Sequence, residues 1–231
     1  MIKLINKKIT DDYSKSHGSV NVFLNPYSYL VMRKNRELLS YIDNIYIDGE
    51  WLCKFLRYFG VANVTRCSFD NTSFAPIFFK SLSIDQSIGV IGSDQDSNDE
   101  FCDWIELNYP KVNVNFRNDG YFNDEKDRYK LIQEILNSNV DNLICGMGTP
   151  LQEEFITKLK DKGWKGTAFT CGGFIHQTAK KGSNYYPNWV NYYNLRFLFR
   201  IWDEPKLLKR YVFDYPKFVI IYFLDLYLNV D

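Results

Sequence analysis

Short apolar runs alternate with longer stretches of helical periodicity along most of this chain. The runs predict strands at Val20–Leu24, Ile42–Ile47, Ser87–Ile91, Val112–Phe116, Leu143–Cys145 and Thr167–Thr170. Helical patterns fall between them, over Tyr27–Leu39, Glu50–Tyr58, Thr72–Leu82, Asn98–Leu107, residues 123–137 and from Pro150 onward. Repeated strand–helix units favour parallel strands with helices on both faces. We therefore predict a Rossmann-like, doubly wound α/β fold with a mostly parallel sheet.

The two ends of the chain do not follow this pattern. Residues 1–18 are polar and predict irregular structure or an edge hairpin. Residues 185–231 contain no convincing parallel strand and are rich in aromatic, aliphatic and basic residues. We expect an α/β catalytic domain over residues 1–184 and a helical appendage over residues 185–231. The appendage either packs on the domain or offers a basic, aromatic face to a membrane surface.

Composition narrows the classes of function. The chain has 231 residues, with 28 basic and 28 acidic side chains, so no global charge indicates a nucleic-acid partner. Five cysteines stand singly without a CxxC pair, which is typical of a reduced, cytoplasmic protein and not of a zinc site or a disulfide framework. No His/Cys cluster is visible, so no metal and no cofactor is expected. We also expect no signal peptide and no transmembrane helix.

One strand–loop–helix stretch organises the candidate chemistry. Gly146 and Gly148 follow the buried run Leu143–Cys145 and allow the backbone to turn tightly and approach a ligand. Gln152 then lies at the carboxyl end of a strand, on the first turn of the next helix, which is where open α/β sheets bind ligands. The alternative is an ordinary turn between a strand and a helix.

Polar side chains follow the other strands in the same way. These residues are Asn25, Asp48, Arg66, Asp119 and His176, and we expect them to converge on one edge of the sheet. Asp48 ends an apolar strand and precedes Gly49, so it is the candidate general base. The alternative is that Asp48 caps the next helix. Dinucleotide-binding, P-loop and hydrolase-elbow motifs are absent, and Asp94-Gln-Asp96 fits helix capping better than metal binding.

Nine short segments in order give a family resemblance. They are Asn25-Pro26, Asp48-Gly49, Arg66-Cys-Ser-Phe-Asp70, Ile91-Gly92, Asn108-Tyr-Pro110, Asp119-Gly-Tyr-Phe122, Gly146-Met-Gly-Thr-Pro-Leu-Gln-Glu153, Gly172-Gly173 and Glu204-Pro-Lys206. Together they cover residues 19–212 and resemble the WecG/TagA/CpsF glycosyltransferases. The resemblance implies metal-independent, inverting transfer from a UDP-sugar to a polyprenyl-diphosphate-linked sugar. It also implies a role in a bacterial capsule, exopolysaccharide, teichoic acid or common antigen.

The resemblance assigns roles to individual residues. Asp48 corresponds to the proposed base, and Asn25, Gln152 and Arg66 line the same pocket. Nucleotide-sugar contacts fall on the residues Gly92, Gly120, Tyr121, Gly146, Gly148, Gly172 and His176. The appendage cations Arg196, Arg200, Lys206 and Arg210 would contact the lipid diphosphate at the inner leaflet of the cytoplasmic membrane, which implies a cytoplasmic, peripherally membrane-associated enzyme.

The chain departs from the common family pattern at two pocket positions. Phe23 stands where many members carry Thr, and His176 stands where many carry Asp. Two alternatives stand beside the transferase, the first motivated by these departures and the second by an appendage that simply packs on the core. One is a catalytically weak binding or scaffold subunit of a polysaccharide assembly complex. The other is a soluble nucleotide-sugar enzyme without a lipid partner.

Overall fold

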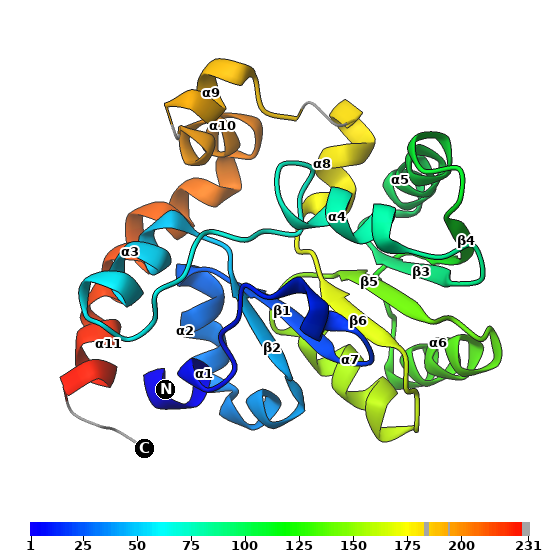
Figure 1. The fold of residues 1–231 in the computed structure, drawn as a ribbon, viewed down its shortest axis with the longest axis horizontal. Helices are drawn as coiled ribbons and strands as arrows, with labels where there is room; N and C mark the ends of the chain where they lie inside the picture. The colour runs from blue at the N-terminus through cyan, green and yellow to red at the C-terminus, as the bar shows by residue number, and fades with distance from the viewer. Residues whose placement is uncertain (183–184, 194, 228–231) are drawn as a thin grey trace.

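A single six-stranded sheet forms the centre of the computed structural model, which describes residues 1–182, 185–193 and 195–227 (Figure 1). Its strands are β1 (Val20–Leu24), β2 (Asn44–Ile47), β3 (Ser87–Gly92), β4 (Asn113–Asn118), β5 (Asn142–Gly146) and β6 (Thr167–Thr170). The spatial order is β2-β1-β6-β5-β3-β4, and each neighbouring pair is parallel. The predicted doubly wound α/β fold is confirmed, and all the paired strands are parallel.

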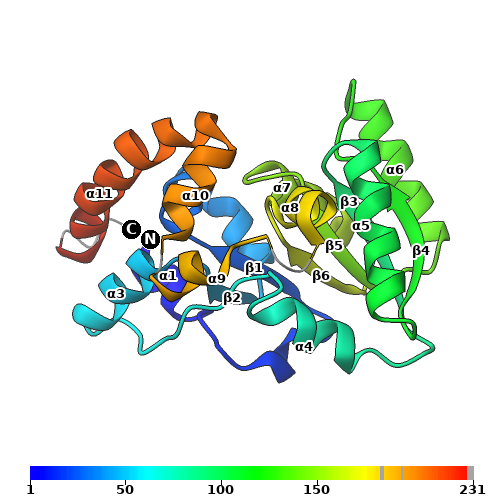
Figure 2. The ribbon, with the colours of Figure 1, turned by 90° about the horizontal axis from the view of Figure 1, so that it is seen from above.

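Helices connect the strands and cover both faces of the sheet, as the view from above shows (Figure 2). In the first 182 residues they are α1 (Ile2–Asn6), α2 (Pro26–Lys34), α3 (Glu50–Tyr58), α4 (Phe74–Ser81), α5 (Gln95–Asn108), α6 (Glu125–Asn137), α7 (Leu151–Asp161) and α8 (Phe174–Lys181), with 3-10 turns η1 (Tyr13–Ser16) and η2 (Arg36–Tyr41).

Alternation along the strands divides the core into two clusters. In β5, Leu143 and Cys145 face the cluster that holds α2, α6 and α7, whereas Ile144 faces the cluster of α4, α5 and α8. Phe169 of β6 belongs to the second cluster and packs against Phe78 with 4.6 Å between ring centroids. Both faces are therefore apolar, which explains the short, uninterrupted hydrophobic strands of the sequence.

Two expected elements differ from the structure. The predicted edge hairpin in residues 1–18 is wrong, because this segment forms α1, η1 and one isolated parallel bridge between Ile9 and Ile45. The helix expected over Tyr27–Leu39 ends at Lys34 and continues as the 3-10 turn η2. Asn35 causes this break: its amide donates to the Val31 carbonyl at 2.9 Å, and its backbone leaves the helical region.

The C-terminal segment is mostly helical in the part that the structure describes. It consists of α9 (Asn188–Tyr192), α10 (Arg196–Asp203), the 3-10 turn η4 (Pro205–Leu207), the π-helical turn η5 (Arg210–Asp214) and α11 (Tyr215–Tyr227). Helix α11 lies against α2 and α3, where Phe218 and Tyr222 are buried (Figure 1). None of the described helices is long and apolar enough to cross a membrane. The division into domains at residue 184 stays a prediction.

Candidate active site

A cavity of about 840 Å³ opens at the carboxyl ends of the strands, beneath the C-terminal helices. It brings together residues far apart in sequence. Those predicted as site residues that line it are Asn25, Asp48, Arg66, Tyr121, Gly146, Gly148, Gln152, Gly172, His176, Arg196, Arg200 and Arg210. Gly92 and Gly120 do not line the cavity, and the side chain of Lys206 lies outside the described part of the chain.

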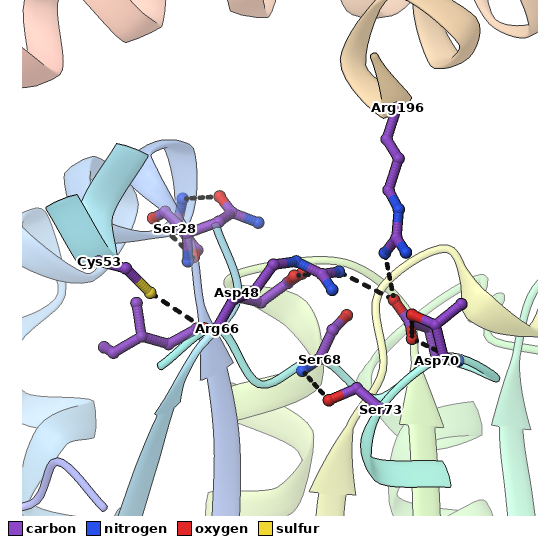
Figure 3. Close-up of polar contacts among 11 residues, drawn as sticks. Ser28, Asp48, Cys53, Arg66, Ser68, Asp70, Ser73 and Arg196 are labelled. Carbon is purple, nitrogen blue, oxygen red and sulfur yellow. Dashed lines mark hydrogen bonds and ion pairs between the residues drawn. The ribbon is translucent and has the colours of Figure 1, made fainter. Parts of the chain in front are cut away.

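Asp48, Arg66 and Asp70 form a charged chain in this cavity (Figure 3). Nη2 of Arg66 lies 3.1 Å from Oδ1 of Asp48 and 2.9 Å from Oδ2 of Asp70. The α3 helix begins after Gly49 without a side-chain cap. The alternative that Asp48 merely caps this helix is therefore wrong, and its carboxylate is available to the cavity.

Asp70 is the most heavily bonded carboxylate of this group. Its Oδ1 accepts from the backbone N–H of Thr72 at 2.9 Å and from the Thr72 hydroxyl at 2.6 Å, and Nη1 of Arg196 lies 3.5 Å from Oδ2. Burial opposes ionisation, but the Arg66 charge and these bonds lower the pKa of Asp70 below its ordinary value. Asp70 is therefore an anion at neutral pH.

Two cavity arginines have opposing pKa shifts. Burial and the nearby Arg66 charge lower the pKa of Arg196. Burial also disfavours the charge of Arg200, but Tyr186, Tyr211 and Glu204 raise its pKa above the ordinary value. Guanidinium groups keep their charge at physiological pH in either case. The C-terminal helices therefore place permanent positive charge in the cavity.

Aromatic rings accompany these cations. Cζ of Arg210 lies 3.8 Å from the centroid of the Tyr27 ring, and Cζ of Arg196 lies 5.1 Å from that of Tyr186. Both distances are within the range of cation–π attraction. Burial raises the pKa of the Tyr186 phenol to about 12, so that the phenol stays neutral.

Asn25 and Gln152 are held by local hydrogen bonds. Asn25 caps α2: its Oδ1 accepts from the Ser28 N–H at 3.0 Å, and its own N–H donates to the Ser28 hydroxyl at 2.8 Å. Gln152 is 3% exposed, and its Nε2 donates to Oε1 of Glu153 at 3.0 Å and to the Thr149 hydroxyl at 3.3 Å. Oε1 of Gln152 and Oε2 of Glu153 are buried without a hydrogen-bond partner among the described residues.

Two of the predicted glycines permit close packing. A Cβ on Gly92 would lie 2.5 Å from the carbonyl of Gly146, and one on Gly120 would lie 2.7 Å from Met147. Any side chain at Gly92 would therefore force β3 and β5 apart. Gly148 and Gly172 instead have φ values of +78° and +55° and meet nothing within 4 Å. The nucleotide contacts assigned to these glycines stay predictions.

His176 stands at the rim near the start of α5. Its Nδ1 lies 3.1 Å from the Ser97 hydroxyl and 3.8 Å from Oδ2 of Asp94. Asp94 caps α5 through the Ser97 N–H at 3.0 Å, as expected from the sequence. No group of three or more His, Cys, Asp or Glu side chains in the described ranges could hold a metal ion.

Three residues in or near the cavity have no role predicted from the sequence. Asp70 belongs to the Arg66–Asp70 motif, but this segment is a loop, so the spacing of the two residues does not predict their ion pair. Glu153 ends the Gly146–Glu153 motif on the first turn of α7, where a carboxylate is usually solvated, yet it is 2% exposed and burial raises its pKa. Tyr186 lines the cavity from the C-terminal segment, and no pattern in the sequence indicates this.

Comparison with known proteins identifies the family of this chain. A family model described as the glycosyl transferase WecG/TagA/CpsF family matches residues 2–229. Over 218 residues the chain is 35% identical to a curated Shigella boydii protein, UDP-Gal:alpha-D-GlcNAc-diphosphoundecaprenol beta-1,4-galactosyltransferase. The match covers 94% of this chain and 87% of that protein. The resemblance inferred from the motifs is confirmed, and the chain belongs to the WecG/TagA/CpsF family of glycosyltransferases.

Proposed function

We propose that this glycosyltransferase moves a hexose from a UDP-sugar to a polyprenyl-diphosphate-linked sugar, with inversion, during synthesis of a bacterial cell-surface polysaccharide. The observation that carries the proposal is the placement of Asp48 at the end of β2, in a cavity with arginines from two distant segments. The galactosyltransferase activity in the name of the Shigella protein makes UDP-galactose the first donor to test.

Asp48 acts as the general base in this proposal. Arg66 contacts its Oδ1, and Oδ2 has no hydrogen-bond partner among the described residues. The acceptor hydroxyl gives its proton to Asp48 while its oxygen bonds to the anomeric carbon. The bond from that carbon to the UDP oxygen breaks on the opposite face, and UDP leaves with the electron pair. One carboxylate suffices for this single displacement.

The leaving diphosphate needs positive charge beside it. Arg66 already contacts two carboxylates, so Arg196, Arg200 and Arg210 are the cavity cations that we assign to diphosphate charge. Fixed cations placed where charge develops stabilise a transition state without further reorganisation. Backbone N–H groups at the starts of α7 and α8 add to this field. This set of charges requires no metal ion.

The C-terminal helices would dock the enzyme on the inner face of the cytoplasmic membrane. Exposed apolar side chains gather there and are Trp189, Tyr192, Tyr193, Leu198, Trp202, Leu208, Val212 and Phe213. Aromatic and aliphatic groups of this kind suit the headgroup boundary, and neighbouring cations attract anionic lipids. A peripheral, cytoplasmic location follows from this proposal, because the lipid-linked acceptor is then presented to the cavity from the membrane.

A transfer assay tests the proposed function. Purified protein is incubated with UDP-galactose, UDP-glucose or UDP-N-acetylglucosamine and a short-chain polyprenyl-diphosphate N-acetylglucosamine, and products are detected by mass spectrometry. We expect a mass increase of one hexose with at least one donor, in the presence of EDTA as well as in its absence. No added sugar with any donor would favour the scaffold alternative. Loss of activity in EDTA and recovery with Mg²⁺ or Mn²⁺ would contradict metal independence.

A further inference from the structure

One guanidinium nitrogen of Arg66 contacts two carboxylates. Nη2 lies 3.1 Å from Asp48 and 2.9 Å from Asp70, so the shorter contact is to the residue that is not the proposed base. Figure 3 shows Arg66 reaching from Asp48 toward Asp70, with Arg196 approaching Asp70 from the C-terminal helices. The charge of Arg66 is therefore divided between two anions.

The Asp70 carboxylate is fixed in place independently of Arg66. The backbone and hydroxyl of Thr72 both donate to Oδ1, which leaves Oδ2 for the two arginines. The side chain of Asp70 is 15% exposed, compared with 30% for Asp48. A rigid, ionised Asp70 thus sets where the Arg66 guanidinium can lie.

We propose that Asp70 is a positioning residue that shares Arg66 with Asp48, and so keeps Asp48 able to accept a proton while holding Arg196 in the cavity. This inference rests on the proposed function, since it concerns the base of that reaction. An undivided guanidinium would stabilise the Asp48 carboxylate and make it a weaker base. The second negative charge offsets this effect.

Other charged and titratable side chains also interact electrostatically with Asp48. Arg196 and Arg200 carry positive charge toward it from α10. The neutral titratable groups that interact with its charge are Cys53, Cys67, Tyr186 and Tyr215. Burial raises the pKa of both cysteines to about 11 and keeps both tyrosines protonated at physiological pH. Glu50 and Glu204 also line the cavity, but Asp70 is the anion that contacts the same Arg66 nitrogen as Asp48. Its removal therefore changes the field at Asp48 in one direction.

The test compares full-length wild type with Asp70→Asn, which keeps Oδ1 as an acceptor for Thr72. Protein labelled with ¹³C at the aspartate carboxyl is titrated by NMR, and the Asp48 signal is assigned by its loss in Asp48→Asn. We expect the Asp48 carbon to titrate about one pH unit lower in Asp70→Asn. The acid limb of kcat/KM should move in the same direction, and kcat should fall roughly ten-fold.

Two control variants distinguish the effect of shared Arg66 charge from a general loosening of the loop that holds Asp70. Thr72→Val removes one bond to Asp70 but leaves both arginine contacts, and Asp103→Asn removes a carboxylate that pairs with Arg117 outside the cavity. We expect neither to shift the Asp48 titration. A shift in Thr72→Val equal to that in Asp70→Asn would overturn the proposal, and so would coincident titrations of Asp70→Asn and wild type.

A second variant, Arg196→Gln, tests the proposal even if Asp70→Asn does not fold. Arg196→Gln removes the cation on the other side of Asp70 and lets Asp70 draw Arg66 away from Asp48. We expect the Asp48 titration to move to higher pH, and an unchanged titration would overturn the inference. The NMR readout needs no turnover. Absence of transfer by the wild type would therefore contradict the proposed function alone, and the titrations would still decide how Arg66 is shared.

Discussion

Asp225 of α11 forms an ion pair with Arg33 of α2, in which Nε of Arg33 lies 2.9 Å from both carboxylate oxygens. The hydroxyl of Tyr29 also donates to Asp225 at 2.7 Å, and the Asp225 side chain is fully buried. Helix α2 begins at Pro26, directly after its cap residue Asn25, which lines the cavity. The last described helix is therefore anchored to the same element that presents a site residue.

We expect Asp225→Ala to lower the free energy of unfolding by about 3 kcal/mol, because it leaves Arg33 and Tyr29 without their buried partner. Urea denaturation measures this change. The matched control is Glu134→Gln, which breaks the exposed pair with Lys130 and should cost less than about 0.5 kcal/mol. Equal, small effects of the two substitutions would show that α11 is not anchored in this way.

Glu153 gives a prediction about stability and pH. Burial raises its pKa in the folded protein, so its stabilising contribution is full below the unfolded pKa of about 4.3 and is lost as the pH rises through the folded pKa. Glu153→Gln imitates the protonated form. We expect the variant to match wild type near pH 4 and to be the more stable protein at pH 7. Thermal unfolding at both pH values checks this, and a variant less stable than wild type at pH 7 would contradict it.

Tyr121 is 72% exposed at the cavity rim, where its ring is available to a uracil base. Tyr121→Ala should weaken UDP binding by roughly 1–3 kcal/mol, the range for loss of base–aromatic stacking. Calorimetry with UDP measures the affinity. Tyr129→Ala is the control, because Tyr129 is a half-exposed tyrosine outside the cavity. Unchanged affinity in Tyr121→Ala would remove this residue from the nucleotide site.

Membrane docking predicts a loss of liposome binding when its apolar contacts are removed. Val212 and Phe213 are 52% and 65% exposed on η5, and we expect the double change to Ser to reduce flotation with anionic liposomes at least roughly ten-fold. UDP binding should be unchanged. The matched control changes Ile84 and Leu107 to Ser, since both are exposed and lie far along the chain from this segment. Equal flotation of the two double variants would contradict the assigned docking surface.

The strands and helices that could be predicted from the sequence are those marked by a pattern of neighbouring residues. Val20–Leu24 and Thr167–Thr170 match β1 and β6, because short apolar runs bounded by polar residues suit buried parallel strands. The helix after β1 was predicted too long, since its end depends on one Asn35 side-chain bond that periodicity does not reveal. The N-terminal helix was missed because it has only five residues, and its buried Ile2 and Ile5 pack on a distant part of the chain.

Site residues could likewise be predicted where a strand end places them, and not where a contact between distant segments does. Asn25, Asp48 and Gln152 were predicted together because each follows a strand, and parallel strands end at one edge of the sheet. The contact between Asp70 and Arg196 joins residues more than a hundred positions apart, so no spacing pattern marks it. The unusual burial of Glu153 depends in the same way on tertiary packing, which a sequence pattern does not describe.

We propose Asp48 as the base of the glycosyl transfer in this cavity. Transfer from UDP-galactose to the short-chain lipid acceptor is measured for wild type and Asp48→Asn, alongside UDP affinity by calorimetry. We predict at least about a hundred-fold loss of kcat with UDP affinity nearly unchanged, because general-base effects are about 10²-fold or larger. A variant that keeps more than roughly a tenth of the wild-type rate would contradict this assignment of Asp48.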